Sequence, residues 1–107
     1  MAAGAAMNDP YPPLEIRHNA AKSRFEATVD GQTSFAAYDR DDDVLRINHT
    51  SVPPSLQGRG IGAAVVRAAL DYARTNGLKV EPWCSYVRTY MKRHKDTQTL
   101  LPSGFRL

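Results

Sequence analysis

Cysteine is almost absent from this sequence. The 107 residues include one, Cys84, so no disulfide can form within the chain. Disulfides are typical of oxidising compartments, and we therefore expect a cytoplasmic location. Long apolar runs are absent too. None approaches the roughly 18 consecutive residues that cross a membrane, so we expect no membrane partner.

The first residues lack the basic region and the long apolar core of a signal peptide. They are small and rich in proline, so we interpret residues 1–12 as a flexible leader. With 42% hydrophobic residues over the whole chain, the remainder is long enough for one modest core. We therefore expect residues 13–107 to form a single domain.

Positive charge is scarce in the first half of the chain and concentrated in the second. Residues 1–54 hold five Lys and Arg against eight Asp and Glu, a net charge of −3. Residues 55–107 hold nine against three, a net charge of +6. A basic half suits an anionic partner, either nucleic acid or a small polyphosphate ligand, although it can also be a merely solvated surface.

The first half has the alternation of β-strands. Strand-like segments occur at 14–18, 24–29, 33–38 and 44–52, and Asp30-Gly31 between the second and third is a strong hairpin signal. The acidic run 39–43 is expected to be a solvated turn. Four such strands in succession predict an antiparallel meander.

The second half changes to a helical period. Apolar residues recur every three or four positions from about 59 to 76, and a short strand follows at 78–81. A strand, a helix and another strand imply a right-handed crossover and a parallel pair. Ser85 is a candidate cap for a second helix that runs to about His94. The sequence predicts an α+β fold with a parallel fifth strand and a C-terminal helix.

Three glycines lie where the fourth strand gives way to the long helix, in Gln57-Gly58-Arg59-Gly60-Ile61-Gly62. Free backbone N–H groups and the helix dipole make such a turn a site for an anion. No Lys-Ser/Thr pair follows, which argues against a P-loop. A dinucleotide fingerprint fits Gly58, Gly60 and Ala63, with Glu81 about 20 residues on, but Pro53 to Leu56 separate the strand from the first glycine.

The turn also reads as Gln-x-x-Gly-x-Gly, which resembles the pyrophosphate-binding signature of the GNAT superfamily of N-acetyltransferases. The likeness is closer to a small single-domain branch of that superfamily and covers roughly residues 14–100. Three further motifs carry it, in the order of the branch: His49-Thr50-Ser51-Val52-Pro53, Pro82-Trp83-Cys84-Ser85-Tyr86-Val87 and Arg93-His94.

This resemblance implies acetyl-CoA as the cosubstrate and no metal. The pyrophosphate would lie on the N–H groups of the glycine turn, the pantetheine arm would lie near the end of the fourth strand, and basic residues of the second half would meet the adenosine phosphates. The residues implied for the cofactor are Thr50, Ser51, Val52, Gln57, Gly58, Arg59, Gly60, Ile61, Gly62 and Arg88, with Lys92 and Arg93 as further candidates for the phosphates.

The resemblance also supplies four candidate catalytic residues. His49 is the candidate base that accepts a proton from the incoming amine, because its ordinary pKa of about 6.5 suits that role. Strand alternation predicts it on the face of Leu45 and Ile47. Cys84, just before a helix N-terminus that lowers a thiol pKa, could protonate the leaving thiolate or carry the acetyl group transiently. Tyr86 and Tyr90 are alternative acids, and core packing is the competing interpretation for all four.

The chain departs from the superfamily in one respect. Most members have one or two helices between the first two strands, whereas residues 19–23 leave room only for a turn. The acceptor site is then expected to be open, with room for a small amine or for a protein amine. The leading hypothesis is an N-acetyltransferase, monomeric or weakly dimeric. The alternative is a non-catalytic acyl-CoA-binding module, and a nucleic-acid-binding domain has only the charge in its favour.

Overall fold

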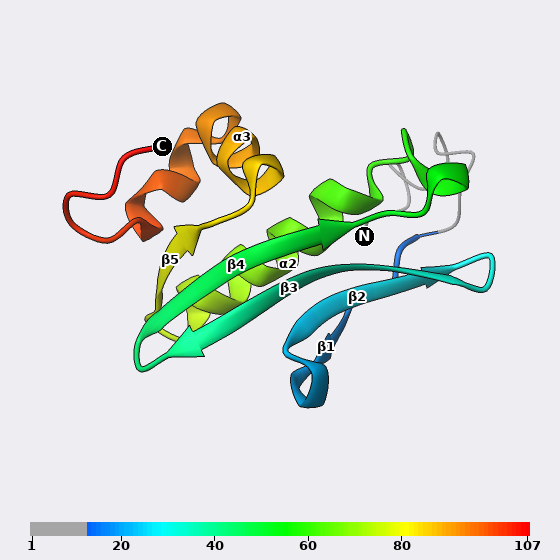
Figure 1. Ribbon diagram of the computed structural model, residues 1–107, viewed down its shortest axis with the longest axis horizontal. Helices are drawn as coiled ribbons and strands as arrows, with labels where there is room; N and C mark the ends of the chain where they lie inside the picture. The colour runs from blue at the N-terminus through cyan, green and yellow to red at the C-terminus, as the bar shows by residue number, and fades with distance from the viewer. Residues whose placement is uncertain (1–12) are drawn as a thin grey trace, which may run out of the picture.

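The computed structural model describes residues 13–107. The proposed leader, residues 1–12, lies outside the described residues. Five strands form one sheet in the order β1-β2-β3-β4-β5. The first four are antiparallel neighbours, and the last runs parallel to β4, as predicted. The strands are β1 (Arg17–Asn19), β2 (Arg24–Val29), β3 (Gln32–Asp41), β4 (Val44–Ser51) and β5 (Lys79–Pro82) (Figure 1).

Two α-helices follow the meander. Helix α2 (Ile61–Thr75) connects β4 to β5, and α3 (Ser85–Arg93) follows β5. Three short 3-10 turns, η1 (Ala20–Lys22), η2 (Pro54–Leu56) and η3 (Lys95–Leu100), complete the described elements. Within the described chain, η1 is the one helical turn between the first two strands. The α+β fold expected from the sequence, without helices in that connection, is confirmed.

Helix α2 packs against one face of the sheet because its apolar residues repeat at helical spacing. Its buried side chains meet those of the strands, and α3 adds more beside them. The core is formed chiefly by Phe25, Ala27, Ala36, Tyr38, Leu45, Ile47, Ile61, Val65, Val66, Ala69, Leu70, Val80, Val87 and Met91. In Figure 1, α2 lies behind the strands and leaves their front face uncovered.

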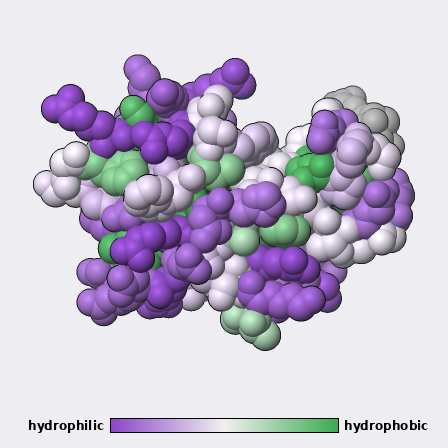
Figure 2. Space-filling model, in the orientation of Figure 1, coloured by the Kyte–Doolittle hydropathy of each residue, from purple (hydrophilic) through white to green (hydrophobic). Residues whose placement is uncertain are grey.

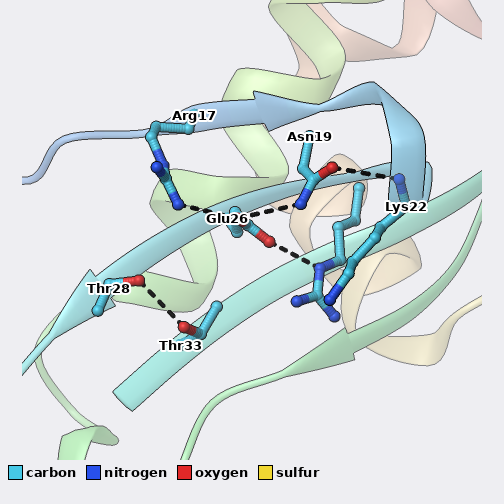
Figure 3. Close-up of polar contacts among 7 residues, drawn as sticks. Arg17, Asn19, Lys22, Glu26, Thr28 and Thr33 are labelled. Carbon is cyan, nitrogen blue, oxygen red and sulfur yellow. Dashed lines mark hydrogen bonds and ion pairs between the residues drawn. The ribbon is translucent and has the colours of Figure 1, made fainter. Parts of the chain in front are cut away.

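The uncovered face is mainly hydrophilic (Figure 2). Glu26 lies on it, with only 6% of its side chain exposed, and it joins β1 to β2. Its carboxylate accepts hydrogen bonds from Arg24 (2.7 Å), Arg17 (3.1 Å) and Asn19 (3.4 Å) (Figure 3). These contacts hold β1, which is only three residues long, at the edge of the sheet.

Two local expectations were wrong. The acidic run 39–43 is not entirely a turn, because β3 continues to Asp41 and pairs with β4 as far as Val44. Its carboxylates tolerate the strand because they face solvent. Ser85 does not cap α3. It is the first helical residue, and Cys84 occupies the cap position, where its side chain makes no hydrogen bond to the helix backbone.

Strand β4 contains a bulge at Asn48. Tyr38 pairs with Ile47 and Ala37 pairs with His49, so Asn48 has no residue opposite it in the register with β3. An extra residue in one strand reverses the alternation of side chains beyond it. The bulge therefore decides which face of the sheet each of the last four residues of β4 occupies.

None of the helices within residues 13–107 has the length and apolar character needed to cross a membrane.

Candidate functional site

The turn before α2 has an open backbone conformation. Gly58 (φ +85°) and Gly60 (φ +79°) lie in the left-handed region, which glycine enters without strain. A Cβ at either position would meet no atom within 4 Å, so space is open beside the backbone. Gly60 caps α2 and has no side chain to bond the first N–H groups of the helix. These groups therefore have no side-chain cap, the arrangement that an anion at a helix N-terminus can use.

A groove of about 560 Å³ extends from this turn. That volume lies within the range of small-molecule sites. Its walls come from the end of β4, from η2 and the glycine turn, and from the start of α3. The lining residues are Thr50, Val52, Leu56, Gln57, Gly58, Gly60, Ile61, Gly62 and Tyr86.

Seven of these nine residues were predicted to bind the cofactor, and Tyr86 was predicted as a candidate acid. Leu56 was missed. It is buried in η2, and nothing in residues 53–56 indicated that one of them would line the groove. Gln57 helps to shape the wall, because its side-chain amide donates a hydrogen bond to the carbonyl of Val52 (3.2 Å). Ser51, also predicted, pairs with Phe35 and does not line the groove.

Thr50, which lines the groove, contacts Cys84. The thiol of Cys84 lies 3.7 Å from the Thr50 hydroxyl and donates to it. The two can meet because β4 and β5 part at this point. The backbone N–H of Trp83 makes a final hydrogen bond to the Ile47 carbonyl (2.9 Å), and β4 continues beyond it without a parallel neighbour. Cys84 is half-buried. A thiol and a hydroxyl thus adjoin the end of the groove.

Tyr86 packs against the start of α2. Its hydroxyl oxygen is 2.9 Å from the position that a Cβ on Gly62 would take, so the glycine permits this approach. Burial and the neighbouring Tyr90 raise the pKa of the Tyr86 hydroxyl. The group therefore stays protonated near neutral pH and can donate a hydrogen bond into the groove.

His49 does not share the face of Leu45 and Ile47, and the alternation argument for it was wrong. The bulge at Asn48 turns its side chain to the uncovered face of the sheet, where its ring lies 5.7 Å from that of Phe35. Thr50, the next residue, pairs with the buried Ala36 and faces the groove. The candidate base and the thiol therefore lie on opposite sides of β4.

Three other predicted residues lie outside the groove. The guanidinium of Arg59 pairs with Asp30 in the β2–β3 hairpin (3.3 Å). Arg88 donates to the carbonyls of Pro82 (3.4 Å) and Arg106 (3.1 Å). Tyr90 is buried, and its ring stacks on His94 with a centroid distance of 4.0 Å.

No group of three His, Cys, Asp or Glu side chains that could hold a metal ion occurs among residues 13–107.

Comparison with known proteins agrees with this geometry. Protein NATD1 of Gallus gallus and of Mus musculus are each 28% identical to the chain over 91 residues, which is 82% of this chain and 83% of the relative. A GCN5-like protein from Staphylococcus aureus, solved by NMR in solution, superposes with a TM-score of 0.69 at 25% identity. That match covers 90% of this chain and 94% of the other. Residues 24–100 match the family of GCN5-related N-acetyltransferases. The chain therefore belongs to the GCN5-related N-acetyltransferase family.

Proposed function

We propose that this chain transfers an acetyl group from acetyl-CoA to an amine. The observation that carries the proposal is the groove itself, which joins an anion-binding helix N-terminus to a thiol and a hydroxyl at Thr50 and Cys84. The open glycine turn fits a pyrophosphate, since no side chain caps the start of α2 and a Cβ at Gly58 or Gly60 would meet no atom within 4 Å. Val52, Leu56 and Ile61 offer an apolar wall to the pantetheine arm.

Acetyl-CoA supplies the acetyl group as a thioester, whose thiolate leaves when the amine is acylated. Side chains of this protein would move two protons, one to the leaving thiolate and one from the incoming amine. The Cys84 thiol either protonates that thiolate or carries the acetyl group transiently, and its contact with Thr50 places it beside the groove as both roles require. Free backbone groups of β4 beyond Ile47 would meet the thioester oxygen as an oxyanion hole does.

His49 remains the candidate base, on the other side of the sheet. An amine that reaches the parting of β4 and β5 from the uncovered face would pass His49, which could accept its proton there. No α-helix of the described chain covers that face, so a protein amine could approach as readily as a small one. The single cysteine suits a reducing, intracellular location.

The test of the cofactor is calorimetric titration with acetyl-CoA, with NAD as the control ligand. The matched variants are Gly60→Asp and Gly60→Asn. Asp and Asn are similar in shape and both tolerate the left-handed conformation of this residue, but only Asp brings a negative charge to the turn. We expect wild type to bind acetyl-CoA and not NAD, and Gly60→Asp to bind at least about tenfold more weakly than Gly60→Asn.

Absence of acetyl-CoA and CoA binding would sink the proposal. Binding without transfer to any amine would favour the alternative, an acyl-CoA-binding module without catalysis. Mass spectrometry separates the two roles of the Cys84 thiol, with Cys84→Ser as the control protein that lacks the thiol. After incubation with acetyl-CoA, mass spectrometry of wild type should show one acetyl group on Cys84 if the thiol is a carrier, and none if it acts as an acid.

A further inference from the structure

Trp83 is the most exposed of the large apolar side chains that the structure describes, with 60% of its surface accessible. It does not belong to the hydrophobic core. Its position is nevertheless fixed at two points. The indole Nε1 donates a hydrogen bond to the Glu81 carboxylate (2.9 Å), and the backbone N–H donates to the Ile47 carbonyl (2.9 Å). Tryptophan is enriched among the residues that anchor binding partners, and here its ring is oriented before any partner arrives.

Glu81 belongs to a row of charged residues that crosses three strands. Asp39 of β3 pairs with Arg46 of β4, and Arg46 pairs with Glu81 of β5. We call these three residues the charged row. Neighbouring strands lie about 4.8 Å apart, so the charged row spans about 10 Å across the uncovered face. The Arg46 guanidinium contacts both Glu81 (3.0 Å) and Asp41 (3.3 Å), so one cation serves two carboxylates.

The charged row and its neighbours carry more negative than positive charge. The Asp39 carboxylate accepts a hydrogen bond from the neutral amide of Asn48 (2.9 Å) and makes no ion pair among residues 13–107. Lys79, the cation of β5, donates to the carbonyl of Thr99 (3.2 Å). A positively charged partner therefore suits this part of the surface, although the net charge of the whole chain is +3.

Trp83 and the charged row lie beside the parting of β4 and β5, which diverge in Figure 1. Successive side chains of an extended segment point to opposite faces. Trp83 therefore faces the uncovered side, whereas Cys84 after it reaches Thr50 at the groove. His49 pairs with the residue two positions before Asp39 on β3, so it shares the uncovered face with the charged row. That offset of two residues is about 7 Å along the strand.

We propose that Trp83 and the charged row select the acceptor by binding a Lys or Arg side chain that lies two residues from the reacting lysine of a protein segment. The inference rests on the proposed function. Side chains two positions apart in an extended peptide share a face and lie about 7 Å apart. With the reacting amine beside His49, the second cation would therefore meet the carboxylates of the charged row and the ring of Trp83.

The dimensions of the surface favour a protein segment over a small amine. His49 lies about 7 Å from the charged row, and the row itself extends about 10 Å, so a small monoamine cannot contact both. No α-helix of the described chain covers this face, so an extended peptide can lie along it. Tryptophan is also the aromatic side chain that attracts a cation most strongly.

The test measures steady-state acetyl transfer to pentapeptides with blocked termini, whose only amine is a central lysine. Arg-Gly-Lys-Gly-Arg has positive charges two residues from that lysine. Gly-Arg-Lys-Arg-Gly has the same composition with the charges adjacent to it, and Glu-Gly-Lys-Gly-Glu reverses the charge. The first peptide should have a KM about fivefold below that of the second and at least about tenfold below that of the third.

Two variants test the surface directly. Trp83→Ala should raise the KM of the first peptide about fivefold, while the affinity for acetyl-CoA stays at the wild-type value, because Trp83 does not line the groove. The change should appear in KM and not in kcat, since the indole holds the flanking charge and not the reacting amine. Asp39→Asn should narrow the difference between the first and third peptides. Asp71→Asn is the matched control, because it removes the same charge from an exposed residue of α2, on the other side of the sheet.

Equal KM values for the three peptides would overturn the inference and leave the proposed function intact. So would a Trp83→Ala variant with the wild-type KM for the first peptide. A small acceptor, Nα-acetyl-lysine methylamide, with a KM no higher than that of the first peptide would also overturn it, because the flanking residues would then contribute nothing. Absence of acetyl-CoA binding, or binding without transfer to any amine, would instead remove the proposed function and the inference with it.

Discussion

His49 and Thr50 are neighbours in the chain, yet their side chains lie on opposite faces of the sheet. Thr50 pairs with the buried Ala36 and meets the Cys84 thiol, whereas His49 pairs with Ala37 and contacts Phe35 on the uncovered face. The bulge at Asn48 determines which residue faces which way. Under the proposed function, cofactor binding and proton acceptance would take place on different sides of one strand.

This separation predicts that His49→Ala impairs turnover and not cofactor affinity. We expect acetyl transfer to fall about 100-fold, the effect of losing a general base. The affinity for acetyl-CoA should stay at the wild-type value, because His49 does not line the groove. Steady-state kinetics and calorimetry measure the two quantities. Thr28→Ala, at an exposed residue of β2, is the control, and unchanged transfer by His49→Ala would remove His49 from the mechanism.

The pair of Arg59 with Asp30 predicts that Arg59→Gln has little effect on cofactor binding. The two side chains are 3.3 Å apart and the carboxylate is largely exposed, so the pair contributes about 0.5 kcal/mol to the free energy of unfolding. Arg59→Gln and Asp30→Asn should therefore give similar small changes in stability. In both variants the loss of acetyl-CoA affinity should stay below the roughly tenfold cost of a lost phosphate contact.

A larger loss of affinity in Arg59→Gln alone would show that this residue binds the pyrophosphate, as the motif indicated. Calorimetry on both variants distinguishes the two results.

Glu26 is predicted to stabilise the edge of the sheet in a pH-dependent way. Hydrogen bonding to Arg24 is the main cause that lowers the pKa of its carboxyl below the ordinary 4.5. Because the folded-state pKa is depressed, this stabilisation is present above the unfolded-state pKa and is lost as pH falls through the folded-state value. Glu26→Gln removes the charge and should lower the free energy of unfolding near pH 7 by about 2 kcal/mol.

Urea denaturation of both proteins from neutral pH down to about pH 3 provides the measurement, since this range extends below the ordinary pKa of 4.5 for a Glu carboxyl. The difference in unfolding free energy should shrink as the pH falls. A difference that stays constant would contradict the role assigned to the ionised carboxylate.

The close approach of Tyr86 to Gly62 predicts a non-additive pair of substitutions. Alanine is preferred over glycine within a helix by about 1 kcal/mol. In Gly62→Ala, however, the new Cβ would lie 2.9 Å from the Tyr86 hydroxyl and displace it, so this gain should be lost. In a Tyr86→Ala background the same substitution should raise the free energy of unfolding by about 1 kcal/mol. An equal effect in both backgrounds, measured by urea denaturation, would mean that the contact imposes no constraint.

Much of this arrangement follows from local chemistry that the sequence displays. The spacing of Ile61, Val65 and Ala69 predicts the buried side of α2, and the glycines before it predict the open turn. Each depends on residues near one another in the chain, where side-chain period and glycine freedom decide the structure. The groove and most of its lining were predictable for that reason.

Other features depend on long-range pairing and could not be predicted. Residues 44–51 alternate like a regular strand, and only the register against β3 shows that Asn48 is extra. The direction of the Arg59 side chain depends on Asp30, which lies 29 positions earlier in the chain. Such contacts arise from the folded arrangement and leave no local pattern.

The parting of β4 and β5 beyond Ile47 has a kinetic consequence. If the cofactor occupies the helical side of β4 and the amine arrives from the uncovered side, neither ligand blocks the entrance of the other. Either one can then bind first, and CoA can depart before or after the acetylated amine. Because the helices cover only one face of the sheet, we expect random-order kinetics. A single shared entrance would instead require the two ligands to bind in a fixed order.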